Sequence, residues 1–331
     1  MQATPPDGQI HEGIAGSELR RDVSVWGSYM WGYAAVGADI YTALGIITLA
    51  ALGLAPLAFL AAGIVFALVG LCYAELASAY PLAGGGQYFT LRGLGDTAGL
   101  VAGAALVLDY TIDISLFTVV AFGYFNYFLP WITFGRHITD FTIPIGPVHL
   151  AWLWLIESVG GILLLIWLNV RGIKVSTNFN EVIGTIAIIA QTIIVVAGLV
   201  LVWDPDLVSH QILFNRPTLS EFAFGSSLAI IAFVGLETIS QVAQETRRPA
   251  TIIPRTSIGL VVSVLLFAMA FSILAIGMVD TQTGKPLDFH GHEGDPVALI
   301  ALNIPVIGLV AAPLTAAIGA LIVFISANSG V

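Results

Sequence analysis

The feature that most constrains this chain is a series of eight apolar runs, each long enough to cross a lipid bilayer as a helix. The runs lie at about 25–52, 56–80, 97–128, 150–169, 180–203, 222–244, 253–278 and 305–331. A hydrocarbon core of about 30 Å requires about 20 apolar residues at a helical rise of 1.5 Å per residue. The runs lack the two-residue alternation of membrane β-strands. The sequence therefore predicts an all-α, polytopic transmembrane helical bundle.

The composition agrees with a membrane protein and disfavours enzymes and nucleic-acid-binding proteins. Only 10% of the residues are charged, whereas soluble domains carry roughly 25%. The net charge of −10 is spread over the loops, so we expect no nucleic-acid surface. The chain has no nucleotide-binding loop, zinc motif or Ser-His-Asp set, so we expect neither an enzyme nor a cofactor. The single cysteine, Cys72, lies within the second run, where we interpret it as a small packing residue.

The positions of the basic residues predict the orientation of the chain. Eight of the eleven fall in the polar N-terminal tail or after the second, fourth and sixth runs: Arg20, Arg21, Arg92, Arg171, Lys174, Arg247, Arg248 and Arg255. Arg136, Arg216 and Lys285 follow the third, fifth and seventh runs. Loops rich in Lys and Arg stay in the cytoplasm. We therefore expect a multi-pass protein of the cell membrane with a cytoplasmic N-terminus.

Acidic residues near the centres of the predicted spans are the strongest sign of function. Asp39, Asp109, Asp113, Glu157 and Glu237 have no basic partner at their own depth. A charge at the bilayer centre costs about 2.5–3.5 kcal/mol on insertion scales, so such residues are functional candidates. An uncompensated carboxylate takes up a proton or binds a cation. For Glu157 we favour a structural role, as a protonated group bonded between helices.

Two of the spans carry glycines beside these acids, which predicts that both helices are interrupted. In the first span, Gly37 and Gly45 flank Asp39, and in the sixth span Gly235 precedes Glu237. Interrupted helices expose backbone groups to a ligand at mid-membrane, although glycines also permit close helix packing. Two such helices five spans apart suit an inverted repeat of five helices.

These signals together give a set of candidate site residues. The candidates for substrate binding are Gly37, Ala38, Asp39, Tyr41, Thr42, Gly45, Tyr110, Phe233, Gly235 and Glu237. For ion or proton coupling they are Asp39, Asp109 and Asp113, and the last two share one helical face because they lie four residues apart. The loop DFHGHEGD, which contains His290 and His292, could offer ligands to a divalent metal, but we favour a solvated acidic loop.

Four segments resemble those of the amino acid–polyamine–organocation permeases, and they occur in the order typical of that family. They are CYAELASAYPLAGGGQYFTLRGLG at 72–95, LDY at 108–110, LNVRGIKVS at 168–176 and GLETISQVAQETRRPATIIPR at 235–255. The resemblance implies a five-plus-five inverted-repeat fold of twelve helices, with helices 1 and 6 broken around a central substrate site. It also implies alternating access driven by proton or sodium gradients or by exchange.

The resemblance divides the chain into three parts. Residues 1–24 would form a cytoplasmic tail, 25–203 the first repeat with helices 1–5, and 204–331 an incomplete second repeat with helices 6–8. The chain would then be a piece of a longer protein with further helices.

The sequence also departs from the family pattern at three places. Asp39 lies where many members have a small neutral segment that receives a substrate carboxylate, so it would repel a carboxylate and attract an amine or a cation. Asp39 and LDY also resemble potassium importers of the Kup and KimA type, but Ile46 replaces their tyrosine. A lysine found in helix 5 of some proton-coupled members is matched by Ala187.

We therefore expect a secondary transporter for amino acids or related amines, with the lipid bilayer and a small molecule as its partners. A potassium–proton symporter on the same fold is one alternative. A membrane sensor that binds a solute without moving it is an alternative of another class. The sequence does not indicate an oligomeric state.

Overall fold

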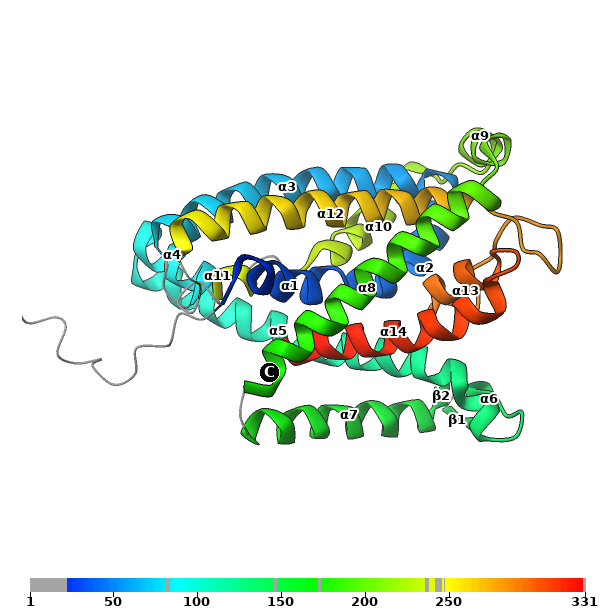
Figure 1. The fold of residues 1–331 in the computed structure, drawn as a ribbon, viewed down its shortest axis with the longest axis horizontal. Helices are drawn as coiled ribbons and strands as arrows, with labels where there is room; N and C mark the ends of the chain where they lie inside the picture. The colour runs from blue at the N-terminus through cyan, green and yellow to red at the C-terminus, as the bar shows by residue number, and fades with distance from the viewer. Residues whose placement is uncertain are drawn as a thin grey trace, which may run out of the picture.

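A computed structural model shows the helices packed side by side in one elongated bundle (Figure 1). It describes residues 23–80, 84–145, 148–171, 174–235, 238–241, 246 and 248–329. Helix α4 (Gly85–Leu94) lies at one end of the bundle, which we call the α4 end. Helix α13 (Pro296–Leu302) lies at the opposite end, which we call the α13 end.

The expected all-α polytopic fold is confirmed. Among the described residues, six helical runs are long and apolar enough to span a membrane, and the first of them, Val25–Ala79, contains two of the expected spans. The apolar part of α7, Trp152–Trp167, is shorter. The long helices are α1 (Val25–Val36), α2 (Asp39–Ala51), α3 (Ala55–Ala79), α5 (Asp96–Phe125), α7 (Trp152–Arg171), α8 (Lys174–Leu201), α10 (Leu219–Ala229), α12 (Pro249–Gly277) and α14 (Gly308–Ser329).

The chain reverses direction between the first two spans at the short 3-10 helix η1 (Leu52–Leu54). Leu52 has a positive φ of 49°, and the amide of Gly53 donates a 3.0 Å hydrogen bond to the carbonyl oxygen of Asn215. A Cβ on Gly53 would overlap the carbonyl of Gln211, so only glycine fits this approach. The end of the first span is thereby attached to α9 (Pro205–Phe214).

Both predicted helix interruptions are confirmed. The first span divides into α1 and α2 at Gly37 and Ala38. The sixth span begins as α10 and continues through the 3-10 helix η4 (Ile231–Phe233). It then turns at Gly235, whose φ is +100°, before α11 (Thr238–Gln241) begins. The positive φ explains why the turn uses glycine.

Several short elements at the ends of the bundle were not predicted from the sequence. They are α4, α6 (Leu129–Ile132), α9, α13, the 3-10 helices η2 (Asn126–Phe128) and η3 (Ile138–Phe141), and a hairpin of β1 (Thr142–Ile145) and β2 (Val148–Ala151). The strands are antiparallel, and Thr142 pairs with Ala151. Such elements are too short to span a bilayer, so a search for long apolar runs misses them.

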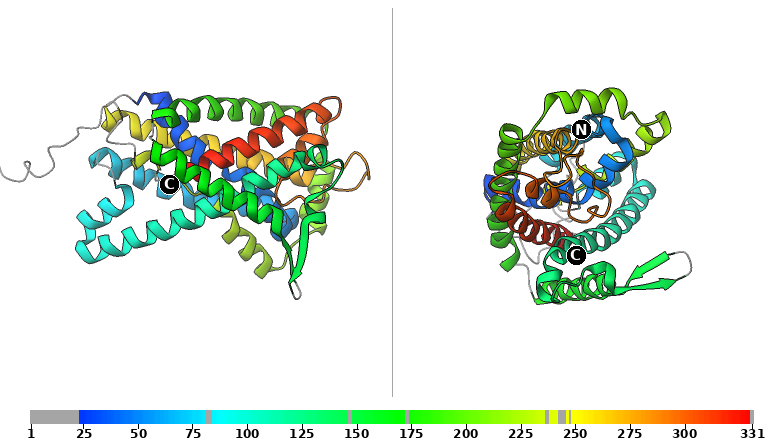
Figure 2. Two further views of the ribbon diagram at one scale, coloured as in Figure 1. Left: turned by 90° about the horizontal axis from the view of Figure 1, so that it is seen from below. Right: turned by 90° about the vertical axis from the view of Figure 1, so that its right-hand side faces the viewer.

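The interrupted first span lies inside the bundle, and α3 and α12 pack along each other beside it (Figure 1). Most residues of α1 and α2 are buried. At the α13 end, the chain between α12 and α14, which includes α13, lies over the middle of the bundle (Figure 2, right). This position makes that segment a cover over the end of α2.

The described basic residues are divided between the two ends of the bundle, as the alternating direction of the spans predicts. Arg92, Arg171, Lys174, Arg248 and Arg255 belong to segments at the α4 end, whereas Arg136, Arg216 and Lys285 belong to segments at the α13 end (Figure 1). Arg20, Arg21 and Arg247 lie outside the described residues.

Candidate functional site

The two helix interruptions lie against each other. A Cβ added to Gly235 would lie 3.0 Å from the Cβ of Ala35 and 3.5 Å from Cγ2 of Val36, at the end of α1. Helix α11 also packs on α1, because a Cβ on Gly32 would lie 2.7 Å from Cγ1 of Ile239. The fold therefore brings together the glycine segments that the sequence singled out in the first and sixth spans.

Side chains from two other helices bond to the carbonyl groups at the end of α1. A helix end leaves its last carbonyls without helical partners, and buried carbonyls require others. The Ser326 hydroxyl of α14 donates to the carbonyl oxygen of Ala35 at 3.1 Å. The Gln191 amide of α8 donates to the carbonyl oxygen of Gly37 at 3.4 Å, and its own oxygen accepts the hydroxyl of Tyr33.

Sequence reasoning missed both of these partners. Gln191 is fully buried, and it is an amide in the middle of the mostly apolar span at 180–203. A polar amide among apolar residues could have indicated its role, because a buried amide needs hydrogen-bond partners. Ser326 carries no comparable signal, since a serine within a membrane helix commonly bonds to its own backbone.

Asp39 lies at the first position of α2, directly after the interruption. Its side chain is fully buried, and among the described residues it is the only Asp, Glu, Lys or Arg that is buried. The positive end of a helix dipole at its N-terminus stabilises a carboxylate there. Ala38, which precedes it, is also fully buried. The site thus places one carboxylate deep in the bundle, at the start of a half-helix.

The next candidates along α2 are enclosed by α5 and by the cover at the α13 end. Tyr41 is fully buried, and its ring meets that of Tyr124 edge to face, with centroids 5.5 Å apart. Thr42 is buried as well. A Cβ on Gly45 would lie 3.2 Å from the Cβ of Pro296, so Gly45 allows the cover to approach α2 closely.

The candidates in the sixth span lie on its turn. Phe233 is buried, and its ring stacks on that of Phe66 from α3, with centroids 5.0 Å apart. The Thr238 hydroxyl donates to the carbonyl oxygen of Gly235 at 2.6 Å, which fixes the turn before α11. Glu237 lies outside the described residues.

Asp109, Tyr110 and Asp113 lie together near the middle of α5. All three are half-buried, and the neighbouring side chains of Leu108 and Ile112 are exposed. Nearer the end of α5, the Tyr124 hydroxyl donates to the carbonyl oxygen of Tyr41 at 3.0 Å, and this bond joins α5 to the first span. Glu157 is half-buried on α7.

A cavity of about 560 Å³ opens at the α13 end, beyond the far end of α2. Its lining includes Thr48, Leu52, Gln211, Lys285 and His290. Within the described residues, no cluster of three or more His, Cys, Asp and Glu side chains could hold a metal ion.

Comparisons with known proteins point to one family. The family model described as "Amino acid permease" matches residues 28–331. The methylthioribose transporter of Bacillus subtilis (strain 168) is 30% identical over 282 residues, which cover 82% of this chain and 59% of that protein. The cationic amino acid transporter 3, mitochondrial, of Arabidopsis thaliana is 26% identical over 78% of this chain and 44% of its own length.

A third relative is the branched-chain amino acid permease BcaP of Bacillus subtilis (strain 168). It is 25% identical over 85% of this chain and 59% of its own length. The chain spans about half the length of the curated relatives that it matches.

Proposed function

This chain belongs to the amino acid permease family, and from that premise we propose that it moves amino acids or related amines across the cell membrane by alternating access. The observation that carries the proposal is the meeting of two interrupted helices beside the buried carboxylate of Asp39. Discontinuous helices at mid-membrane present backbone groups to a substrate or a coupling ion.

The chemistry of Asp39 favours a substrate that carries a positive group. A buried carboxylate at the start of α2 attracts an ammonium group or a metal cation, and when ionised it repels a second carboxylate. We propose that Asp39 binds the substrate amine or the coupling cation. The neighbouring backbone groups at Gly37 and Gly235 would bind the rest of the ligand. Two similar proteins of Arabidopsis thaliana, named cationic amino acid transporters 2 and 3, support this substrate class.

The arrangement of the chain supports two further parts of the proposal. Residues 25–203 would supply helices 1–5 of the first repeat, and 204–331 the beginning of the second, with its own interrupted helix. The basic residues gather mainly at the α4 end, so we propose that this end faces the cytoplasm together with the N-terminus.

Uptake of radiolabelled solutes into liposomes that contain the full-length protein tests this function. The panel should include L-arginine, L-leucine, putrescine and rubidium, each with and without a pH gradient. We expect saturable uptake of an amino acid or amine above that of empty liposomes. Uptake of rubidium alone would instead support a potassium symporter. Saturable binding without uptake would identify a sensor.

A further inference from the structure

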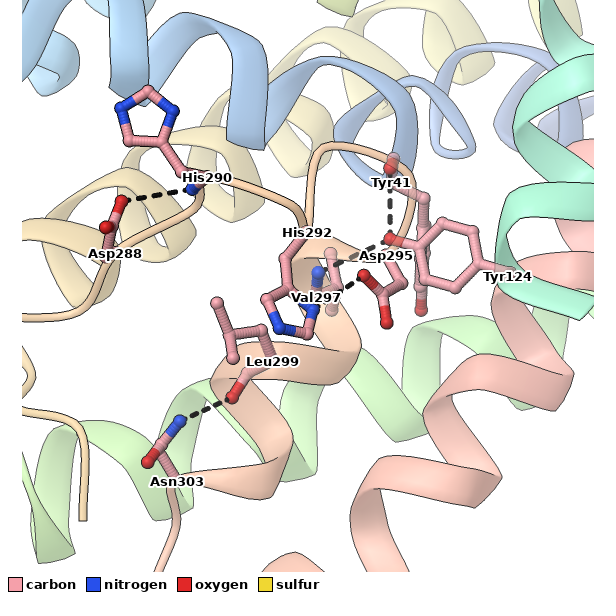
Figure 3. A network of polar contacts seen from close by, with 9 residues as sticks. All are labelled: Tyr41, Tyr124, Asp288, His290, His292, Asp295, Val297, Leu299 and Asn303. Atoms are coloured by element: carbon pink, nitrogen blue, oxygen red, sulfur yellow. Dashed lines mark hydrogen bonds and ion pairs between the residues drawn. The ribbon is translucent and has the colours of Figure 1, made fainter. Parts of the chain in front are cut away.

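Tyr124, near the end of α5, bonds to two separate elements through a single hydroxyl group. The hydroxyl donates to the carbonyl oxygen of Tyr41 at 3.0 Å and accepts the amide of Val297 at 3.3 Å (Figure 3). Tyr41 lies in the first turn of α2, and Val297 lies in the first turn of α13. The first amides of a helix lack helical partners, so the hydroxyl satisfies a group that would otherwise be buried without one.

Glycines allow the surrounding segments to approach this hydroxyl closely. A Cβ on Gly123 would lie 3.2 Å from the carbonyl oxygen of Gly294, and one on Gly45 would lie 3.5 Å from that of His292. On the other side, a Cβ on Gly319 of α14 would lie 2.8 Å from the ring of Tyr124. The segment 292–297 therefore rests directly on α2 and α5, with Tyr124 fully buried at their junction.

The position of Tyr41 connects this junction to the proposed site. Tyr41 is only two residues after Asp39, so the hydroxyl of Tyr124 holds the same helical turn that carries the buried carboxylate. Under the proposed function, a substrate that enters from the α13 end would pass the cover, and the cover would separate from α2 when that end opens.

We propose that the hydroxyl of Tyr124 is a strap between α13 and the first turn of α2, and that it controls how readily the site opens at the α13 end. Tyr124 is then a positioning residue, because it acts through Tyr41 and Val297. The inference rests on the proposed function, since a strap of this kind matters only if the site opens to alternate sides.

Tyr124→Phe removes the hydroxyl and retains the ring contacts with Tyr41 and Gly319. Hydrogen exchange of the full-length protein in lipid nanodiscs measures the opening without any substrate. We expect exchange in the peptides covering 39–51 and 292–302 to rise about twofold to tenfold, the factor that one net hydrogen bond supplies. Exchange in α3 should stay at the wild-type rate. Tyr127→Phe, three residues further on, is the matched control.

Gly45→Ala provides a second variant, because its added methyl group pushes the cover away from α2 without touching the hydroxyl. Increased exchange at 39–51 and 292–302 in both variants supports the strap. No increase in Tyr124→Phe, or an equal increase throughout the chain, overturns it. Hydrogen exchange needs no transported solute. A failed uptake assay would therefore contradict the proposed function, but it would leave the measured effect of Tyr124→Phe on hydrogen exchange unchanged.

Discussion

The side-chain amide of Gln191 donates a hydrogen bond to the backbone carbonyl of Gly37, 154 residues earlier in the chain. This bond closes the end of α1 at the point where the first span is interrupted. It also means that α8 holds the interruption in place, because the oxygen of the same amide accepts the hydroxyl of Tyr33.

We predict that Gln191→Leu destabilises the protein and impairs transport. The substitution retains the approximate volume but leaves the Tyr33 hydroxyl and the Gly37 carbonyl buried without this partner. Each such group costs about 1–3 kcal/mol. The melting temperature in detergent should fall, and uptake should fall with it. Thr192→Val is the control, because the exposed Thr192 hydroxyl bonds to the carbonyl of Ile188 in its own helix. Equal melting temperatures for the two variants would contradict the prediction.

Asp39→Asn tests the role of the buried carboxylate. The amide keeps the size of the side chain and removes its charge, so we predict at least a tenfold loss of affinity for a cationic or zwitterionic substrate. Binding to purified protein should be measured by scintillation proximity. Asp206→Asn, on an exposed turn of α9, should leave the affinity unchanged. Wild-type affinity and transport in Asp39→Asn would exclude a contact with the substrate or the coupling cation.

Asp109 and Asp113 share one face of α5, and two ionised carboxylates this close repel each other. We predict that they share a proton and form a relay for coupling. Asn at either position should abolish uptake driven by a pH gradient while exchange of substrate across the membrane continues. Full proton-driven uptake in both single variants would show that the pair is structural. Tyr110→Phe separates the roles, since a loss of affinity with an unchanged pH profile would mark a substrate contact.

The contact between His292 and Asp295 predicts that the cover is sensitive to pH. Nδ1 of His292 lies 3.0 Å from Oδ1 of Asp295, and this hydrogen bond raises the pKa of His292 above its ordinary value of 6.5 (Figure 3). The charges of Asp295, Glu293 and Asp288 raise it further, against the opposing effect of burial. A raised pKa means that protonated His292 stabilises the folded cover. This stabilisation is fully present below pH 6.5 and is lost as the pH rises through the raised pKa.

We therefore expect the cover to loosen as the pH rises above about 6.5 and through the raised pKa of His292. Hydrogen exchange of the peptide at 292–302 should be faster at the higher pH values, after correction for the intrinsic exchange rate at each pH. His292→Gln should remove this pH dependence and leave the rest of the profile unchanged. The same dependence in that variant would assign the effect to another group.

The sequence predicted the parts of the fold that depend on local patterns. Long apolar runs predicted the spans, and glycines beside acidic residues within two of those runs predicted the interruptions at Gly37 and Gly235. The bonds of Gln191 and Tyr124 could not be predicted, because they join residues 83 to 173 positions apart and depend on how the helices pack. The inverted repeat and the roles of the site residues remain predictions.

The attachment of Gly53 to α9 gives the half-helix α2 a fixed far end. Its amide is bonded to the carbonyl of Asn215, and the chain reverses there with no room for a side chain. Asp39 lies at the opposite end of α2, about 20 Å away at the helical rise. Rotation about this pivot by about 10° would displace the carboxylate by about 3.5 Å, slightly more than the diameter of a water molecule, while the pivot itself hardly moves. The half-helix would then act as a lever, in which a slight tilt is enough to make or break contact with a bound cation.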